Sequence, residues 1–293
     1  MRSFKNFVCI DWSGEAVARP KGLAMAHCTT GSFAPRLLKP ARGWSRESIL
    51  KWLLDHAKAQ TDMLIGLDLS PGLPFVDAGD YFPGNPSSPK DAKALWELVD
   101  RKCAEEAHLS ASTFPKNDNF KAHFRNQYPG ETVTGDAFVG GAGRLREAEH
   151  RQRTNGVNPV SCFNLVGAAQ VGKSSLTGMR LLNRLRGKVP VWPFDDVPLR
   201  GPLIVEIYTS IAARAAGMPK GRSKIRDGDT LNRMLANLGS EPHPSLERYD
   251  DHSTDAMLTA AWLRRAANDP ALWSPRGLTP AIARTEGWTF GAI

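Results

Sequence analysis

The chain has 293 residues, of which 41% are hydrophobic and 23% are charged, and these proportions are ordinary for a globular protein. They exclude a disordered chain, a collagen-like repeat and a small disulfide scaffold. No apolar run approaches the ~20 residues that a membrane-spanning helix needs, and the N-terminus has no secretory apolar segment. We therefore expect a cytoplasmic protein with no membrane partner.

Positive charge is concentrated in one part of the chain. The 38 Lys and Arg against 30 Asp and Glu give a net charge of +8. Residues 144–226 contain 15 basic and 5 acidic side chains, a net +10, so the remaining residues carry −2. Such a segment favours a polyanion, nucleic acid first, as the partner. The alternative is a solvated basic face whose Arg stems cover the core.

The first quarter of the chain predicts three strands, a helix and a fourth strand. Three short apolar runs, Phe7–Ile10, Leu23–Cys28 and Pro35–Lys39, are joined by Gly and Pro turns and indicate an antiparallel meander. Ser45 is a helix N-cap, and the apolar residues after it recur at helical spacing. Met63–Leu67 is a buried strand that a carboxylate follows. The order is β-β-β-α-β.

The rest of the chain alternates predicted helices and strands around one irregular region. Residues 110–143 lose periodicity, so 110–160 is predicted to be an insertion or a substrate-facing loop region. The further predicted strands are residues 162–166 and 203–208, and the predicted helices are residues 91–107, 144–153, 176–185, 211–216, 230–238 and 256–263. We expect an α/β fold in which residues 1–293 form a single domain.

Carboxylates recur at the ends of the apolar segments. Asp11, Asp68 and Glu206 each follow or interrupt an apolar strand, and Asp255 stands at the start of an apolar helix. A charge in such a place is costly unless it is paired, hydrogen-bonded or bound to metal. Each residue alone could be an N-cap, a buried hydrogen-bond acceptor or a solvated strand end. Together they are candidate catalytic residues.

A cluster of these carboxylates would need neutralising cations. Carboxylates brought together repel one another unless divalent ions lie between them, and oxygen-only ligands select Mg²⁺ or Mn²⁺ over zinc. Two such ions about 4 Å apart activate water and stabilise the leaving oxygen in phosphodiester hydrolysis. The pattern therefore predicts a nuclease with one or two Mg²⁺ or Mn²⁺ ions. Lys173, Arg151 and Arg153, from the basic segment, are the candidate phosphate-binding residues.

The order and spacing of these segments resemble a known family. The chain is similar to the predicted nucleases of the domain of unknown function 429 family, in the ribonuclease H-like superfamily. The resemblance runs along nearly the whole chain and is carried by Val8–Asp11, Ile65–Pro71, Phe163–Gly172, Val205–Tyr208 and Asp251–Ala256. It implies a mixed five-stranded sheet of order 3-2-1-4-5, flanked by helices and carrying a long inserted segment.

The resemblance also implies a ligand set. Holliday-junction resolvases of the same superfamily place four carboxylates around two metal ions. By position, Asp11 and Asp68 would be the central metal ligands, Asp255 the helix ligand, and Glu206 or Asp251 an additional one. A fifth-strand Glu is not part of the resolvase pattern. The fold also carries sugar kinases, transposases and inactive binding modules, so a catalytically inactive nucleic-acid-binding module is an alternative.

A second motif predicts a different function. Gly167–Ser174 matches G-x-x-x-x-G-K-[ST], the phosphate-binding loop of P-loop nucleotide-binding proteins, in which Lys173 would reach the phosphates and Ser174 would hold Mg²⁺. Such domains usually open with this motif, whereas half the chain precedes it here. A glycine-rich turn whose Lys173 touches a nucleic-acid phosphate is the simpler interpretation.

Aromatic and basic residues interleave in the irregular region. Phe114, Phe120, Phe124 and Tyr128 alternate with Lys and Arg, which is typical of a stacking platform for unpaired bases. A small satellite core beneath a long loop explains the same pattern equally well.

Overall fold

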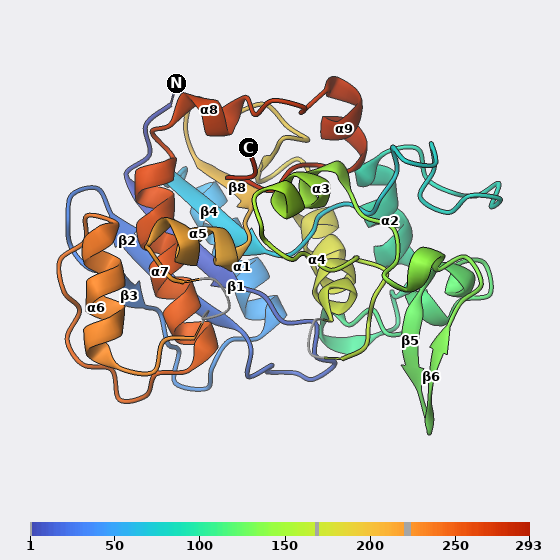
Figure 1. Cartoon of the computed structure of the whole chain (residues 1–293), viewed down its shortest axis with the longest axis horizontal. Helices are drawn as coiled ribbons and strands as arrows, with labels where there is room; N and C mark the ends of the chain where they lie inside the picture. Colours follow the sequence, from blue (N-terminus) through green and yellow to red (C-terminus); the bar gives the residue numbers. More distant parts are fainter. Residues whose placement is uncertain (1, 168–169, 220–223) are drawn as a thin grey trace.

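A mixed sheet lies at the centre of the molecule (Figure 1), in a computed structural model that describes residues 2–167, 170–219 and 224–293. Within these residues six strands form the sheet, in the order β3-β2-β1-β4-β8-β7. β2 pairs antiparallel with β1 and β3, whereas β1, β4, β8 and β7 run parallel. The strands are β1 (Asn6–Asp11), β2 (Ala24–Thr29), β3 (Arg36–Leu37), β4 (Met63–Asp68), β7 (Val191–Trp192) and β8 (Pro202–Glu206).

The sheet confirms the predicted meander. It also has the predicted order 3-2-1-4-5 if β8, from the apolar run at residues 203–208, is counted as the fifth strand. It adds a sixth strand, β7, whose two residues are too few for a periodic signal. The strand predicted at residues 162–166 is wrong, because these residues form turns and only Asn164 makes an isolated bridge, with Arg125. Their apolar side chains fill a core beside the sheet rather than a place in it.

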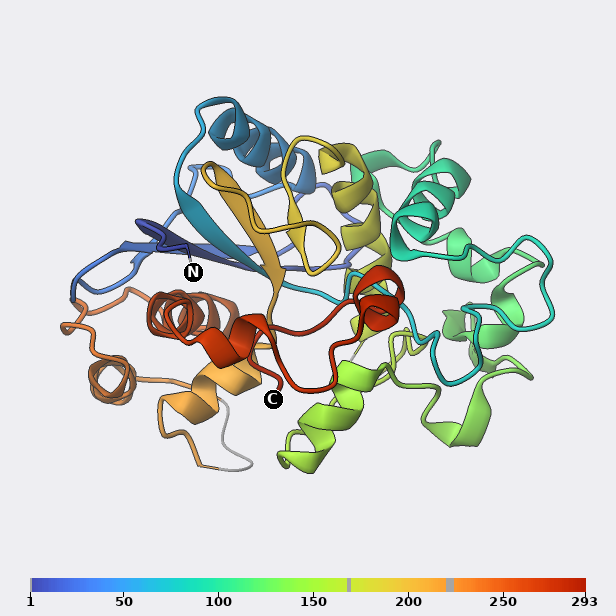
Figure 2. The same cartoon turned by 90° about the horizontal axis from the view of Figure 1, so that it is seen from above.

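Helices cover both faces of the sheet (Figure 2). On one face lie α1 (Arg46–Lys58), α2 (Ala92–Lys102) and α4 (Val171–Leu185), and on the other α5 (Thr209–Ala215), α6 (Gly228–Asn237) and α7 (Asp251–Ala266). Alternate residues of β1 serve the two faces: Val8 and Ile10 pack with the α1 side, and Phe7 and Cys9 with the α7 side. Ser45 caps α1 as predicted, accepting a hydrogen bond from the Ser48 N–H.

The helix predicted at 176–185 begins earlier in the structure, at Val171. Gly172 conceals this earlier start in the sequence, since glycine disfavours helix interiors. Gly178 is needed for packing, because a Cβ there would lie 2.4 Å from Leu69 Cδ2 at the end of β4. The glycine thus brings α4 close to the carboxyl end of the sheet.

The region 110–160 is a set of short elements beside the main sheet. The hairpin of β5 (Arg125–Tyr128) and β6 (Glu131–Thr134) projects from the body of the molecule (Figure 1). Around it lie the short 3-10 turns Ala107–Leu109, Phe114–Lys116, Lys121–His123 and Val139–Gly141, and then α3 (Glu147–Thr154). The predicted stacking platform is wrong for three of its rings, since Phe114, Phe120 and Phe124 are at most 1% exposed and pack against Phe82 and Phe163. They belong to the hydrophobic core on the α1 side of the sheet, so the alternative of a separate satellite core is not confirmed either.

The last residues return to the sheet after α8 (Pro270–Trp273) and α9 (Pro280–Thr285). Thr289 forms an isolated parallel bridge with Glu206, and the Phe290 N–H donates to the Glu206 carbonyl at 2.9 Å. Trp288 and Phe290 are fully buried. In the described ranges, no helix combines the length and the apolar character that crossing a membrane requires.

Candidate functional site

The carboxyl ends of β1 and β4 bring two of the predicted carboxylates together. Asp11 and Asp68 are direct partners in the parallel register of these strands. They lie on the same face as Cys9 and Leu64, which is the face that α7 covers. Carboxyl ends of parallel strands are where α/β proteins hold their ligands. The apolar runs before each Asp explain the placement, because they bury the strands and leave the first charge at the sheet's edge.

Asp255 joins them from the second turn of α7, which packs across β1 and β2. Burial, followed by the negative charges of Asp11 and Asp255, raises the pKa of Asp68 well above its usual range. Burial, followed by Asp11 and Asp251, raises the pKa of Asp255 to about 7. Among the described residues, the side-chain carboxylates of Asp68 and Asp255 have neither a hydrogen bond nor an ion pair. The three side chains form what we call the acidic cluster.

Two further observations define the acidic cluster. Burial, and then the charges of Asp11, Asp68 and Asp255, raise the pKa of the Cys9 thiol, so all three carboxylates act on the same face of β1. His252 Nδ1 lies 2.9 Å from Asp11 Oδ2, and this hydrogen bond raises the pKa of His252. Burial nevertheless keeps the pKa of Asp11 above its usual value.

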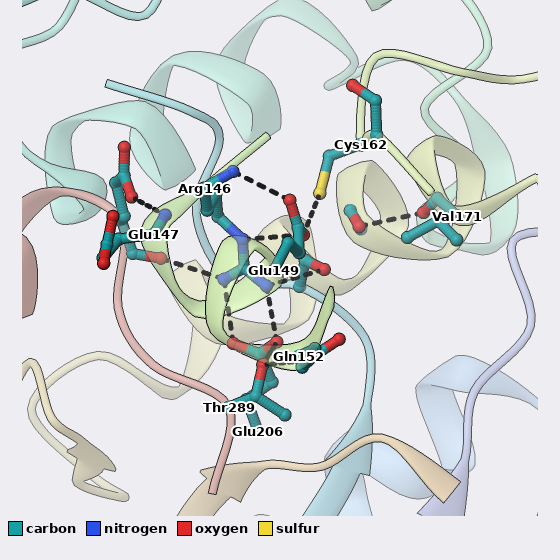
Figure 3. Close-up of polar contacts among 12 residues, drawn as sticks. Arg146, Glu147, Glu149, Gln152, Cys162, Val171, Glu206 and Thr289 are labelled. Atoms are coloured by element: carbon teal, nitrogen blue, oxygen red, sulfur yellow. Dashed lines mark hydrogen bonds and ion pairs between the residues drawn. The ribbon is translucent and has the colours of Figure 1, made fainter. Parts of the chain in front are cut away.

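Glu206 has a different role from the one predicted (Figure 3). It is in register with Leu67 and not with Asp68, so its side chain leaves the other face of the sheet. Arg146 Nη2 donates to Glu206 Oε1 at 2.6 Å and Nη1 to Oε2 at 2.9 Å, while the Thr289 hydroxyl donates to Oε1 at 2.7 Å. Its carboxylate is therefore engaged in a buried ion pair, although it contributes to the raised pKa of Asp68.

Arg146 is the residue that the sequence interpretation missed. Its side chain is 1% exposed and lies between Glu206 and Glu149, whose Oε1 is 3.0 Å from Arg146 Nε (Figure 3). It also donates to the Glu286 carbonyl at 3.0 Å. Burying an arginine requires such a full set of acceptors. The sequence offered one indication of this ion pair, which is Glu149 three residues after Arg146, because that spacing places both side chains on one helix turn.

Asp251 is also engaged with cations. Lys224 Nζ lies 2.6 Å from its Oδ2, and Arg226 pairs with its Oδ1. Burial alone would raise the pKa of Asp251, but the hydrogen bonds from Arg226 and Lys224 hold it below the usual value. The structure thus brings together Asp11, Asp68 and Asp255 and keeps the other two predicted carboxylates in ion pairs.

The acidic cluster has the donor atoms of a metal site but not its arrangement. In the part of the chain that the structure describes, no group of three or more His, Cys, Asp or Glu side chains stands in position to hold one. The donor chemistry does fit a hard divalent cation, since within residues 2–167, 170–219 and 224–293 the carboxylates of Asp68 and Asp255 have no partner and no basic side chain pairs with Asp68. The structure therefore contains carboxylate oxygens that could bind a cation, but in the described residues they do not already surround a metal position.

Two adjoining cavities open beside the acidic cluster. The smaller, of about 290 Å³, is lined by Asp68, Tyr208 and the Arg146 ion pairs. The larger, of about 600 Å³, is lined by His252, by the start of α4 and by β5. They share Trp12, Val171 and Ser174 as walls. Asp68 is the residue of the acidic cluster that lines this concave surface, and His252, which bonds to Asp11, lines its larger part.

The predicted basic surface is mostly neutralised within the fold. Many of its cations pair with carboxylates outside residues 144–226, and the main pairs are Arg144 with Asp77, Arg180 and Arg184 with Asp100, and Arg186 with Glu97. Arg151 pairs with Glu147 at 3.1 Å on α3, next to the exposed Arg153. Lys173 is half-buried and, among the described residues, its ammonium has no partner. Lys220 and Arg222 lie outside the described residues.

In the Gly167–Ser174 segment, the backbone N–H groups of Gly172 and Lys173 are already hydrogen-bonded. The Gly172 N–H donates to the Asn164 carbonyl at 3.1 Å, and the Lys173 N–H to the Gln170 carbonyl at 3.0 Å. Ser174 Oγ donates back to the Val171 carbonyl at 2.9 Å. A phosphate-binding loop needs these groups for the ligand. Ala168 and Ala169 of this motif lie outside the described residues.

No protein-family model, curated protein or solved structure matches this chain. The resemblance to the ribonuclease H-like nucleases therefore stays a prediction. The observed architecture is an α/β fold with a mixed sheet of six strands flanked by helices.

Proposed function

We propose that this chain is a divalent-metal-dependent phosphodiesterase that cleaves nucleic acid at the acidic cluster. The observation that carries the proposal is the meeting of Asp11, Asp68 and Asp255, two of which are unpartnered in the described chain. Buried carboxylates that repel one another are costly and are retained where a cation or a proton is to be held. The order of the segments that carry them supports the same proposal.

Each residue has a defined part in this proposal. Asp68 and Asp255 would hold one or two Mg²⁺ or Mn²⁺ ions together with Asp11, and the metal would supply Lewis-acid activation of water and of the phosphodiester. His252 fixes the Asp11 carboxylate through its hydrogen bond. Lys173 lies on the larger cavity and is placed to contact a phosphate of the substrate. Glu206 and Asp251 position neighbouring segments through their ion pairs.

Cleavage assays test the proposal directly. Single-stranded, duplex and branched DNA and RNA are incubated with the protein in Mg²⁺, in Mn²⁺ and in EDTA. We expect metal-dependent cleavage that Asp68→Asn lowers at least ~100-fold, because it removes a charged ligand. Asp55→Asn, at an exposed pair with Lys51, is the matched control and should keep full activity.

Two results would contradict the proposal. Cleavage that persists in Asp68→Asn identifies a contaminating nuclease. A preparation that binds nucleic acid but cleaves none of these substrates in either metal is a binding module of the same architecture.

A further inference from the structure

The larger cavity holds chemistry that the acidic cluster does not explain. Asn126, on β5, is 6% exposed and lines this cavity. Its Oδ1 accepts a hydrogen bond from the Gln127 N–H at 2.8 Å, but its Nδ2 has no partner in the described chain. A buried donor left unpaired costs about 1–3 kcal/mol. A ligand that brings a hydrogen-bond acceptor to this position would remove that cost.

Two lysines give the larger cavity a positive character. Lys173, at the start of α4, and Lys116 both line it, and neither makes an ion pair in the described residues. Lys116 lies over the Tyr128 ring, 5.5 Å from its centroid. One carboxylate, the exposed Glu15, also lines the cavity. These lysines differ from most of the neighbouring arginines, whose charges are used inside the fold.

Apolar walls complete the larger cavity. Trp12, which directly follows Asp11, is 4% exposed and is held by a hydrogen bond from its Nε1 to Thr177 Oγ1 at 3.0 Å. Pro115 and Leu165 line the cavity as well. The volume of about 600 Å³ falls in the range of small-molecule sites. The cavity therefore matches a ligand with three features: a flat ring for the apolar walls, a hydrogen-bond acceptor for Asn126 Nδ2, and a negative group for the lysines.

We propose that the larger cavity binds one unpaired nucleotide of a single-stranded nucleic acid, next to the phosphodiester that the acidic cluster acts on. The inference rests on the proposed function and names its substrate class. The base would accept a hydrogen bond from Asn126 Nδ2, and the phosphates on either side would contact Lys116 and Lys173. A base within a duplex has its edge paired and its faces stacked, so it cannot enter such a cavity.

The experiment measures binding without cleavage. Fluorescence anisotropy is recorded in EDTA with a labelled 12-nucleotide single strand of mixed sequence, as DNA and as RNA, and with its duplex. We expect the single strand to bind at least tenfold more tightly than the duplex. A 5′-nucleoside monophosphate serves as competitor, and it should displace the strand only at far higher concentration, since it provides one phosphate.

Three variants separate the contacts. Lys173→Ala should weaken strand binding about tenfold and reduce the slope of log K against log salt concentration by about 0.7, the effect of one phosphate contact on a single strand. Asn126→Ala should weaken binding about fivefold and leave the salt slope unchanged, because it removes an uncharged donor. Lys188→Ala, just beyond the other end of α4, is the control and should change neither quantity.

The outcomes are distinct from those of the cleavage assay. Duplex binding as tight as single-strand binding, equal effects of Lys173→Ala and Lys188→Ala, or a monophosphate that binds as tightly as the strand would each overturn the inference. If the expected binding is found but no metal supports cleavage, the proposed function fails while the nucleotide site stands.

Discussion

The raised pKa of Asp255 predicts that its neutral isostere stabilises the metal-free protein. The pKa rises from 3.8 to about 7 through burial and the charges of Asp11 and Asp251. Because one pKa unit corresponds to about 1.4 kcal/mol, ionising Asp255 in the folded state costs on the order of 4 kcal/mol. Asp255→Asn removes this cost and keeps the size of the side chain.

The sign of the effect with pH follows from the direction of the shift. The pKa of Asp255 is higher in the folded state than in the unfolded state. The folded state therefore loses stability as the pH rises from about 4 to about 7, and above pH 7 this loss does not increase further. The gain from Asp255→Asn should be small near pH 4 and reach as much as ~4 kcal/mol at pH 8. Mg²⁺ should reduce the gain, because a cation in the acidic cluster stabilises only the wild type.

Urea unfolding in EDTA at pH 4.5, 6 and 8 measures this difference, with and without Mg²⁺. Asp55→Asn, at the exposed pair with Lys51, is the control and should stay within ~0.5 kcal/mol of the wild type at every pH. The reasoning is refuted if Asp255→Asn is less stable than the wild type at pH 8 in EDTA, or if the difference between them does not change with pH.

The remaining predictions concern packing and buried groups. Glu206→Leu should destabilise the protein by about 3–5 kcal/mol in thermal unfolding, since the buried Arg146 then loses one of its two carboxylate partners; a loss below 1 kcal/mol would contradict the ion-pair role. Gly14→Ala should cost more than ~3 kcal/mol in the same measurement, because its Cβ would lie 2.2 Å from the Lys173 carbonyl carbon, where backbone cannot yield; unchanged stability would show that this loop does not rest on α4. The four cysteines are buried and free, and burial raises the pKa of each thiol, so a thiol reagent at pH 8 should label the native protein far more slowly than the unfolded one; equally fast labelling would contradict their burial.

Runs of apolar residues predicted the strands well, because the burial that produces such a run in the sequence also places it inside the sheet. The apolar runs around Val8, Met25 and Ile65 gave strands because each is buried on both faces of one sheet. The resemblance implied that Asp11 and Asp68 lie together, and in the structure they do, because they end the parallel strands β1 and β4 at the same edge of the sheet. The start of α4 was missed because Gly172, which serves close packing against the Cys162 carbonyl, resembles a break in a helix.

Other features depend on register and on distant partners, which one sequence does not reveal. Glu206 follows its apolar strand much as Asp68 does, but a register offset of one residue turns it to the other face and toward Arg146. The basic segment has an excess of +10 along the chain, yet its arginines meet carboxylates such as Asp77 and Asp100 in space. The glycine-rich motif likewise matches a nucleotide-binding loop by letters, while carbonyls that the motif does not specify occupy its N–H groups.

The return of the C-terminal segment to β8 has a consequence for how the protein folds during synthesis. Thr289 and Phe290 contact Glu206, and Glu286 accepts hydrogen bonds from the Phe75, Val76 and Glu147 N–H groups. Asp11 likewise bonds to His252 on α7, about 240 residues later in the chain. These contacts are of long sequence separation and form late. The acidic cluster therefore cannot form before α7 has been synthesised, and the full set of Arg146 and Glu206 contacts cannot form before residues 286–289 have followed it.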